Sequence, residues 1–166
     1  MIFFAFLLAT TLFILQTIPS LYLPFQAYIP WITFYVLKSF GRKALFTIAI
    51  VGAALDLLSD HPFGVYPISY IATAFFLSHY RFRFSALDPL HLALGSSIAS
   101  FFSSMCQLFL LFLLSDKKVS WGGSIVLVDL FGRALFDGLC AFLWFFLPLT
   151  LFIKCLEKIR VRNLIG

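Results

Sequence analysis

Three carboxylates lie within or beside long apolar segments of this chain. They are Asp56, Asp129 and Asp137. A charged side chain is energetically unfavourable in such a segment and usually has a function there. Such a residue can support catalysis when a nucleophile, a second acid or base, or metal ligands converge on it. None of the three has such companions at catalytic spacing, and the sequence holds no phosphate loop, zinc motif or nucleophile elbow. We therefore predict no catalytic residue, no cofactor and no metal, and a chain that is not an enzyme.

The first carboxylate lies in the stretch GAALDLLSDHPFGVYP, residues 52–67. On a helix, Asp56 shares one face with the small residues Ala49, Gly52 and Ala53, and such a face permits close helix contact in lipid. Asp56 then either marks a partner or substrate site or reaches the nearby membrane interface and ends its helix. Pro67 predicts a kink in the next helix, which with Asp56 would form a shallow polar notch.

Two further patterns predict helix contacts. The run 95–107 carries two rows of small residues followed by Gln107: Gly95, Ala99 and Ser103, then Ser96, Ser100 and Ser104. These rows fit either an interface with another subunit or packing within the chain's own bundle. Arg133 stands four residues from both Asp129 and Asp137, which places all three on one helical face. This face is either a solvated stripe or a docking surface for a partner.

The composition indicates the environment of the helices that carry these residues. The 166-residue chain is 62% hydrophobic, contains 23 phenylalanines and is only 11% charged, whereas soluble domains carry about 25% charged residues. The fold class expected is therefore an all-α integral membrane protein. The three cysteines lack metal-site spacing, and we interpret them as packing residues. The net charge of +5 is attributed to membrane topology and contact with anionic lipid, not to nucleic acid.

Apolar runs of membrane-spanning length predict six transmembrane helices in a single domain, 1–166. They cover residues 2–18, 25–37, 44–58, 62–80, 89–114 and 134–153. Because a helix over 121–153 would be about 50 Å long at 1.5 Å per residue, its first part is expected beyond or along the outer interface. Five spans and a surface helix are the alternative.

The basic residues then orient the chain. Nine of the twelve lysines and arginines fall in the connections after the second, fourth and sixth predicted spans, and only Lys117 and Lys118 fall in the others. By the positive-inside rule, both termini are expected in the cytoplasm.

The segment ALFTIAIVGAALDLLSDHPFGVYPISYIATAFFL, residues 44–77, resembles the third and fourth spans of the bacterial rod shape-determining protein MreD family. The resemblance is carried by Gly52, the triplet beginning at Asp56, Pro62 and Gly64. Gln16 and Pro30 match the family as well. Trp31 stands where the family often has an acidic residue, and the second half of the chain matches in hydropathy alone.

The resemblance implies a non-enzymatic scaffold of the cell-elongation machinery for peptidoglycan, located in the bacterial inner membrane. The partners that it implies are an MreC-like bitopic protein, an MreB-like filament, a RodA-like synthase and penicillin-binding protein 2. The family's fold is similar to that of the substrate-binding subunits of energy-coupling-factor transporters, so the alternative function is a vitamin-binding transporter subunit. The residues expected at partner interfaces are Gly52, Asp56, Gly64, Pro67, Gly95, Ser96, Ser100, Asp129, Arg133 and Asp137.

Overall fold

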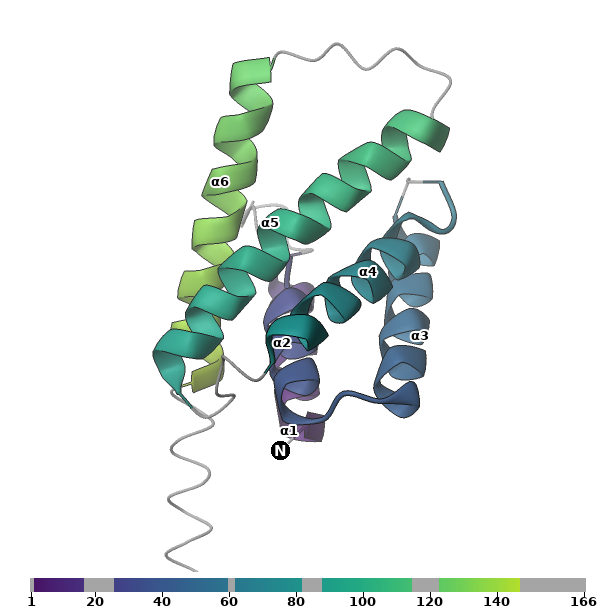
Figure 1. Ribbon diagram of the computed structural model, residues 1–166. Helices are drawn as coiled ribbons and strands as arrows, with labels where there is room; N and C mark the ends of the chain where they lie inside the picture. Colours follow the sequence, from purple (N-terminus) through teal and green to yellow (C-terminus); the bar gives the residue numbers. More distant parts are fainter. Residues whose placement is uncertain (1, 17–25, 60–61, 82–87, 115–122, 147–166) are drawn as a thin grey trace, which may run out of the picture.

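The computed structural model describes residues 2–16, 26–59, 62–81, 88–114 and 123–146 (Figure 1). All regular structure in these ranges is helical, which confirms the all-α class for this part of the chain. The helices are α1 (Ile2–Gln16), α2 (Ile29–Lys38), α3 (Arg42–Leu58), α4 (Val65–Tyr80), α5 (Pro89–Leu114) and α6 (Gly123–Cys140), and α6 continues as a π-helix, Ala141–Phe146.

The first five predicted spans each coincide with one helix, whereas the sixth begins earlier than predicted. Helix α6 starts at Gly123, before the predicted 134. The segment 123–133, expected beyond or along the outer interface because of the length of a helix over 121–153, is thus continuous with the rest of α6. Its charged side chains Asp129 and Arg133 pair with each other at 2.8 Å on the helix surface. Residues 147–153 of the predicted span, the tail beyond them, and Asp60 and His61 lie outside the described residues.

Helix α5 is longer than the other helices of the described residues. Within the described residues, Leu90–Leu114 is the one segment long and apolar enough to cross a membrane by itself, and Ile2–Ile14 is a shorter apolar helix. Helices α1 to α4 have 10 to 17 residues, fewer than the roughly 20 that a bilayer core of about 30 Å requires. Helix α6 has 18 residues but carries three charged ones.

Helix α5 runs diagonally through the bundle, with α6 on one side and α2 and α4 on the other (Figure 1). Its contact with α2 is close because Gly95 faces Thr33, where an added Cβ would lie 3.2 Å from Cγ2. Helix α2 is the most buried helix, and Pro30 lies in its first turn. Trp31 is 1% exposed and packs edge-on against Phe6 of α1, with ring centroids 5.3 Å apart.

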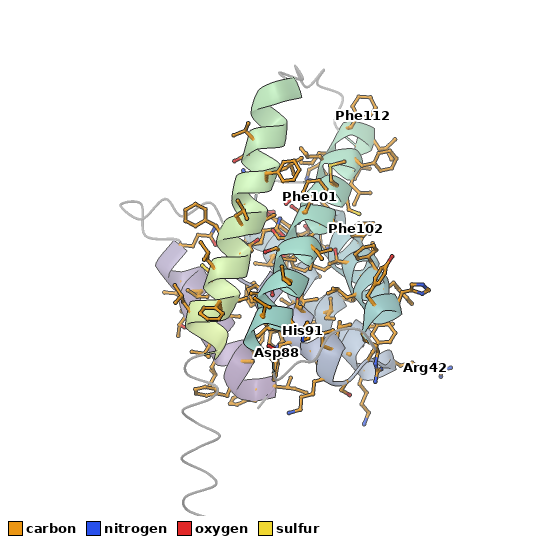
Figure 2. All side chains as sticks on the ribbon, turned by 60° about the vertical axis from the view of Figure 1, so that its left-hand side comes forward. Arg42, Asp88, His91, Phe101, Phe102 and Phe112 are labelled. Atoms are coloured by element: carbon orange, nitrogen blue, oxygen red, sulfur yellow. The ribbon has the colours of Figure 1, made fainter. Side chains whose placement is uncertain are left out.

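Many large apolar side chains lie on the outside of the bundle, and its interior combines an apolar core with buried polar groups. Phe46 of α3, Phe109 of α5 and Leu135 of α6 are 70%, 61% and 66% exposed. The buried polar side chains include seven serines and threonines of α2, α4 and α5 and two aspartates. Figure 2 shows Arg42, Asp88 and His91 toward one end of the bundle and Phe112 toward the other. So large an exposed apolar surface indicates contact with lipid or with other proteins.

The contact between α5 and α6 depends on Gly138, which the sequence analysis did not single out. A Cβ at this position would lie 2.0 Å from the Ser97 hydroxyl and 3.1 Å from the Ala93 carbonyl oxygen. We expect Gly138→Ala to lower the free energy of unfolding by about 1–3 kcal/mol, measured by thermal unfolding in detergent. In a Ser97→Ala background the loss should be smaller, because the closest clashing atom is gone. An equal loss in both backgrounds would contradict the assigned contact.

Candidate functional site

Asp56 caps the N-terminus of α4. It lies near the C-terminal end of α3 and is 4% exposed. Its carboxylate accepts hydrogen bonds from the backbone N–H groups of Gly64, at 2.5 Å, and Tyr66, at 3.0 Å. The first N–H groups of a helix lack partners within it, and the helix dipole favours a negative charge there. The Asp56 carboxylate is thus buried in the bundle and paired with the start of α4.

Gly64 and Pro67 shape the turn that receives this carboxylate. Gly64 has φ +106°, a left-handed conformation in which a side chain is strained. Pro67 lies in the first turn of α4, since that helix begins at Val65. The kink at Pro67 was expected because Pro67 was placed in the interior of the predicted helix. In the first turn no intrahelical donor is lost, so this expectation is corrected.

Gly52 forms the crossing point of α3 and α4. A Cβ added to Gly52 would lie 2.6 Å from the Pro67 Cα and 2.7 Å from its nitrogen. The shared face predicted for Gly52 and Asp56 is confirmed, because both are buried against the start of α4. The element that uses this face is thus α4 of the same chain.

The predicted face of Asp129, Arg133 and Asp137 divides in two. Asp129 and Arg133 pair on the surface, and their side chains are 53% and 44% exposed. Asp137 is fully buried and accepts hydrogen bonds from the Ser100 hydroxyl of α5 and, at 2.9 Å, from the backbone N–H of Gln26. Each turn of an α-helix advances by about 3.6 residues, so positions four apart drift around the axis. This drift allows Asp137 to face α5.

Gln26 is at the centre of a polar network that the sequence analysis missed. Its amide nitrogen donates to the Ser104 hydroxyl and to the Gln107 carbonyl oxygen, both at 3.1 Å. Gln107 in turn donates to Ser69 and Ser103 at 3.4 Å. The network joins the segment before α2 to α4, α5 and α6. The polar face of 95–107 was a visible signal, but nothing in the sequence linked it to Gln26.

The small-residue rows of α5 pack inside the bundle. Gly95, Ser96, Ala99, Ser100, Ser103 and Ser104 are all buried. Of the two interpretations of these rows, the structure agrees with packing against the chain's own helices. Among the residues expected at partner interfaces, Asp129 and Arg133 present the most exposed side chains.

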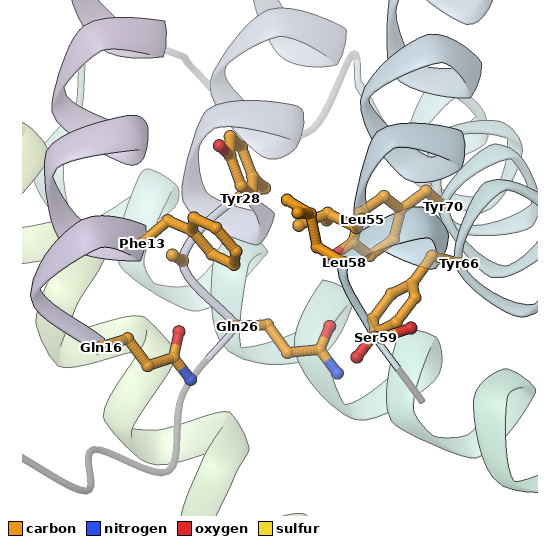
Figure 3. Close-up of a pocket in the computed structure, with 10 residues that line it drawn as sticks. Phe13, Gln16, Gln26, Tyr28, Leu55, Leu58, Ser59, Tyr66 and Tyr70 are labelled. Atoms are coloured by element: carbon orange, nitrogen blue, oxygen red, sulfur yellow. The ribbon is translucent and has the colours of Figure 1, made fainter. Parts of the chain in front are cut away.

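A cavity of about 260 Å³ opens among the ends of α1 to α4 (Figure 3). Its lining comes from four places in the sequence: Phe13 and Gln16; Gln26, Ala27 and Tyr28; Leu55, Leu58 and Ser59; Tyr66 and Tyr70. A notch was predicted at this end of the molecule, around Asp56 and Pro67. Neither residue is among those that line the cavity, because the Asp56 carboxylate is bound to the start of α4.

The lining of the cavity is suited to binding a small molecule. Uncharged polar groups and aromatic rings surround the cavity, and within the described ranges no three residues among His, Cys, Asp and Glu are placed to hold a metal ion. Comparison of the chain with protein-family models, curated proteins and solved structures yields no match.

Proposed function

We propose that the chain is a multi-pass protein of the bacterial cytoplasmic membrane that crosses the bilayer six times with both termini in the cytoplasm. The outward apolar surface of α3, α5 and α6 supports this proposal, because lipid can cover it. The short helices α1 to α4 would reach across by tilting, by using flanking residues or by thinning the bilayer. The basic residues Lys38, Arg42 and Lys43 at the turn between α2 and α3 fit the cytoplasmic side.

We further propose that it is a scaffold subunit of the cell-elongation complex, similar to MreD, and that a partner's transmembrane helix packs on α6. The observation that carries this proposal is an exposed ion pair on an apolar helix. Asp129 and Arg133 are about half exposed beside Phe131 and Leu135, which are 58% and 66% exposed. Charges at a lipid-facing position are costly, so a partner that covers them lowers the free energy of the membrane-embedded state.

Gly132 makes this surface suitable for a helix. It lies between the two charged residues, and no atom stands within 4 Å of the position that its Cβ would occupy. A glycine with open space around it permits a second backbone to approach closely in lipid. The partner that fits is the single membrane helix of an MreC-like bitopic protein. An MreB-like filament, a RodA-like synthase and penicillin-binding protein 2 would join through the same complex.

Affinity purification from the native cells in mild detergent tests the scaffold proposal. We expect the tagged chain to recover the MreC-like protein together with wall synthases, and Gly132→Leu to reduce this recovery about tenfold or more, because the larger side chain separates the helices. Gly41→Leu is the matched control, since Gly41 also has open space around it but lies at the turn before α3. Recovery of no wall-synthesis protein would contradict the proposal, and equal recovery with both variants would contradict the α6 surface.

A second candidate function is the binding of a small molecule, as in a vitamin-transporter subunit. The specific observation that favours it is the cavity among the ends of α1 to α4, with Gln16, Gln26 and Ser59 beside four aromatic rings. Pockets that combine an apolar wall with a few placed polar groups are the usual form of ligand sites.

A further inference from the structure

We infer that the cavity among the ends of α1 to α4 takes a small uncharged molecule that contains a ring and a hydrogen-bond donor. The inference rests on the second candidate function and is independent of the scaffold surface on α6. It makes three claims about the ligand: its charge, its shape and the group by which it is recognised.

The residues that line the cavity indicate the charge of the ligand. Ten of the described residues surround the cavity: four aromatic residues, three aliphatic residues, two glutamines and a serine. None of these carries a formal charge. A charged ligand would lose its hydration on entering the cavity, and these side chains would offer it no opposite charge in return. Such a transfer is strongly unfavourable. Two buried carboxylates are bonded to groups beside this lining, and both already have donors. Asp56 accepts from the N–H groups of Gly64 and Tyr66, and Asp137 accepts from the Ser100 hydroxyl and the Gln26 N–H.

The volume of the cavity and its aromatic walls indicate the shape of the ligand. A volume of about 260 Å³ is slightly smaller than most ligand sites, which span roughly 300–1,000 Å³, and fits a molecule with one ring. Phe13 and Tyr28 form one aromatic pair, with centroids 5.6 Å apart, and Tyr66 and Tyr70 form another at 5.8 Å. The pairs lie on different sides of the cavity in Figure 3. A ring between them would gain aromatic contacts.

Gln26 determines the recognition group. Its amide nitrogen is used by Ser104 and Gln107, and its backbone N–H is held by Asp137. Its amide oxygen is buried and accepts no hydrogen bond from the described residues. A buried acceptor without a donor is costly, so a ligand N–H or O–H that moves aside the atoms covering this oxygen and donates to it would relieve that cost. Asp137, Ser104 and Gln107 act as positioning residues, because they fix Gln26 before the ligand arrives.

Four fluorinated probes separate these claims: 4-fluorobenzamide, 4-fluorobenzoate, 4-fluorobenzylamine as its cation, and fluorobenzene. They share one ring and differ in charge and in donors. ¹⁹F NMR with the full chain in lipid nanodiscs should detect cavity binding of 4-fluorobenzamide that is about tenfold or more tighter than that of the two ions, since an unpaired buried charge costs more than about 1.4 kcal/mol. Fluorobenzene should bind more weakly than the amide because it has no donor.

Two neighbouring variants distinguish the cavity from the lipid. Leu58 lines the cavity and is 73% exposed, whereas Leu57 does not line it and is 78% exposed. Leu58→Trp should remove the cavity signal, and Leu57→Trp should leave it unchanged. If an ion bound more tightly than the amide and Leu58→Trp removed its signal, the uncharged class would be overturned while small-molecule binding would survive. If all probes gave the same signals in both variants, the inference and the second candidate function would both fail, and the scaffold proposal would be unaffected.

Discussion

Replacing Gly52 with alanine should lower the free energy of unfolding by about 3 kcal/mol or more, at or above the upper end of the usual range for overpacking. The reason is that the added Cβ would meet backbone atoms, 2.6 Å from the Pro67 Cα and 2.7 Å from its nitrogen. A side chain can rotate away from a clash, but the first turn of α4 cannot move without losing the two hydrogen bonds to Asp56. The helices α3 and α4 must therefore separate.

Gly132→Ala is the matched control for this prediction. Both glycines lie inside helices, but Gly132 has no atom within 4 Å of its Cβ position. Because alanine has the higher helix propensity, this variant should raise the stability of the isolated chain by up to about 1 kcal/mol. Thermal unfolding in one detergent, followed by circular dichroism, compares the two. Changes of the same sign and size would mean that α3 and α4 do not cross at Gly52.

Asp56→Ala should lower the free energy of unfolding by about 2–4 kcal/mol. The substitution removes the acceptor of two backbone N–H groups at the start of α4, and each unsatisfied buried donor costs about 1–3 kcal/mol. Loss of a helix cap by itself typically costs about 1 kcal/mol. Asp56→Asn keeps one carbonyl oxygen and should lose about half as much. The order wild type, Asn, Ala is therefore expected in denaturant titrations.

Asp129→Ala is the corresponding control, because Asp129 is also an aspartate within a helix but is 53% exposed and pairs with Arg133. An exposed ion pair four residues apart contributes about 0.3–0.5 kcal/mol, so this variant should change stability little in the isolated chain. If Asp129→Ala and Asp56→Ala were equally destabilising, the capping role of Asp56 would be refuted.

Several features of the fold follow from the sequence by local rules. The apolar runs give the positions of the first five helices, because a helix lets a continuous apolar run satisfy its backbone groups within the segment itself. Pro30 lies in the first turn of α2, where the missing N–H has no intrahelical acceptor to lose. The spacing of Gly52 and Asp56 places both on the face of α3 that meets α4, and the rows from Gly95 to Ser104 form the buried face of α5.

The tertiary structure alone decides which neighbour each face meets. Asp56 binds N–H groups that lie 8 and 10 positions further along the chain, across a turn, and Asp137 binds Gln26 across 111 positions. Helical periodicity gives the direction of a side chain about its own axis, but it carries no information about the packing of one helix on another. The polar network around Gln26 and the cavity among four helix ends are products of that packing. They therefore become visible only when the helices are assembled.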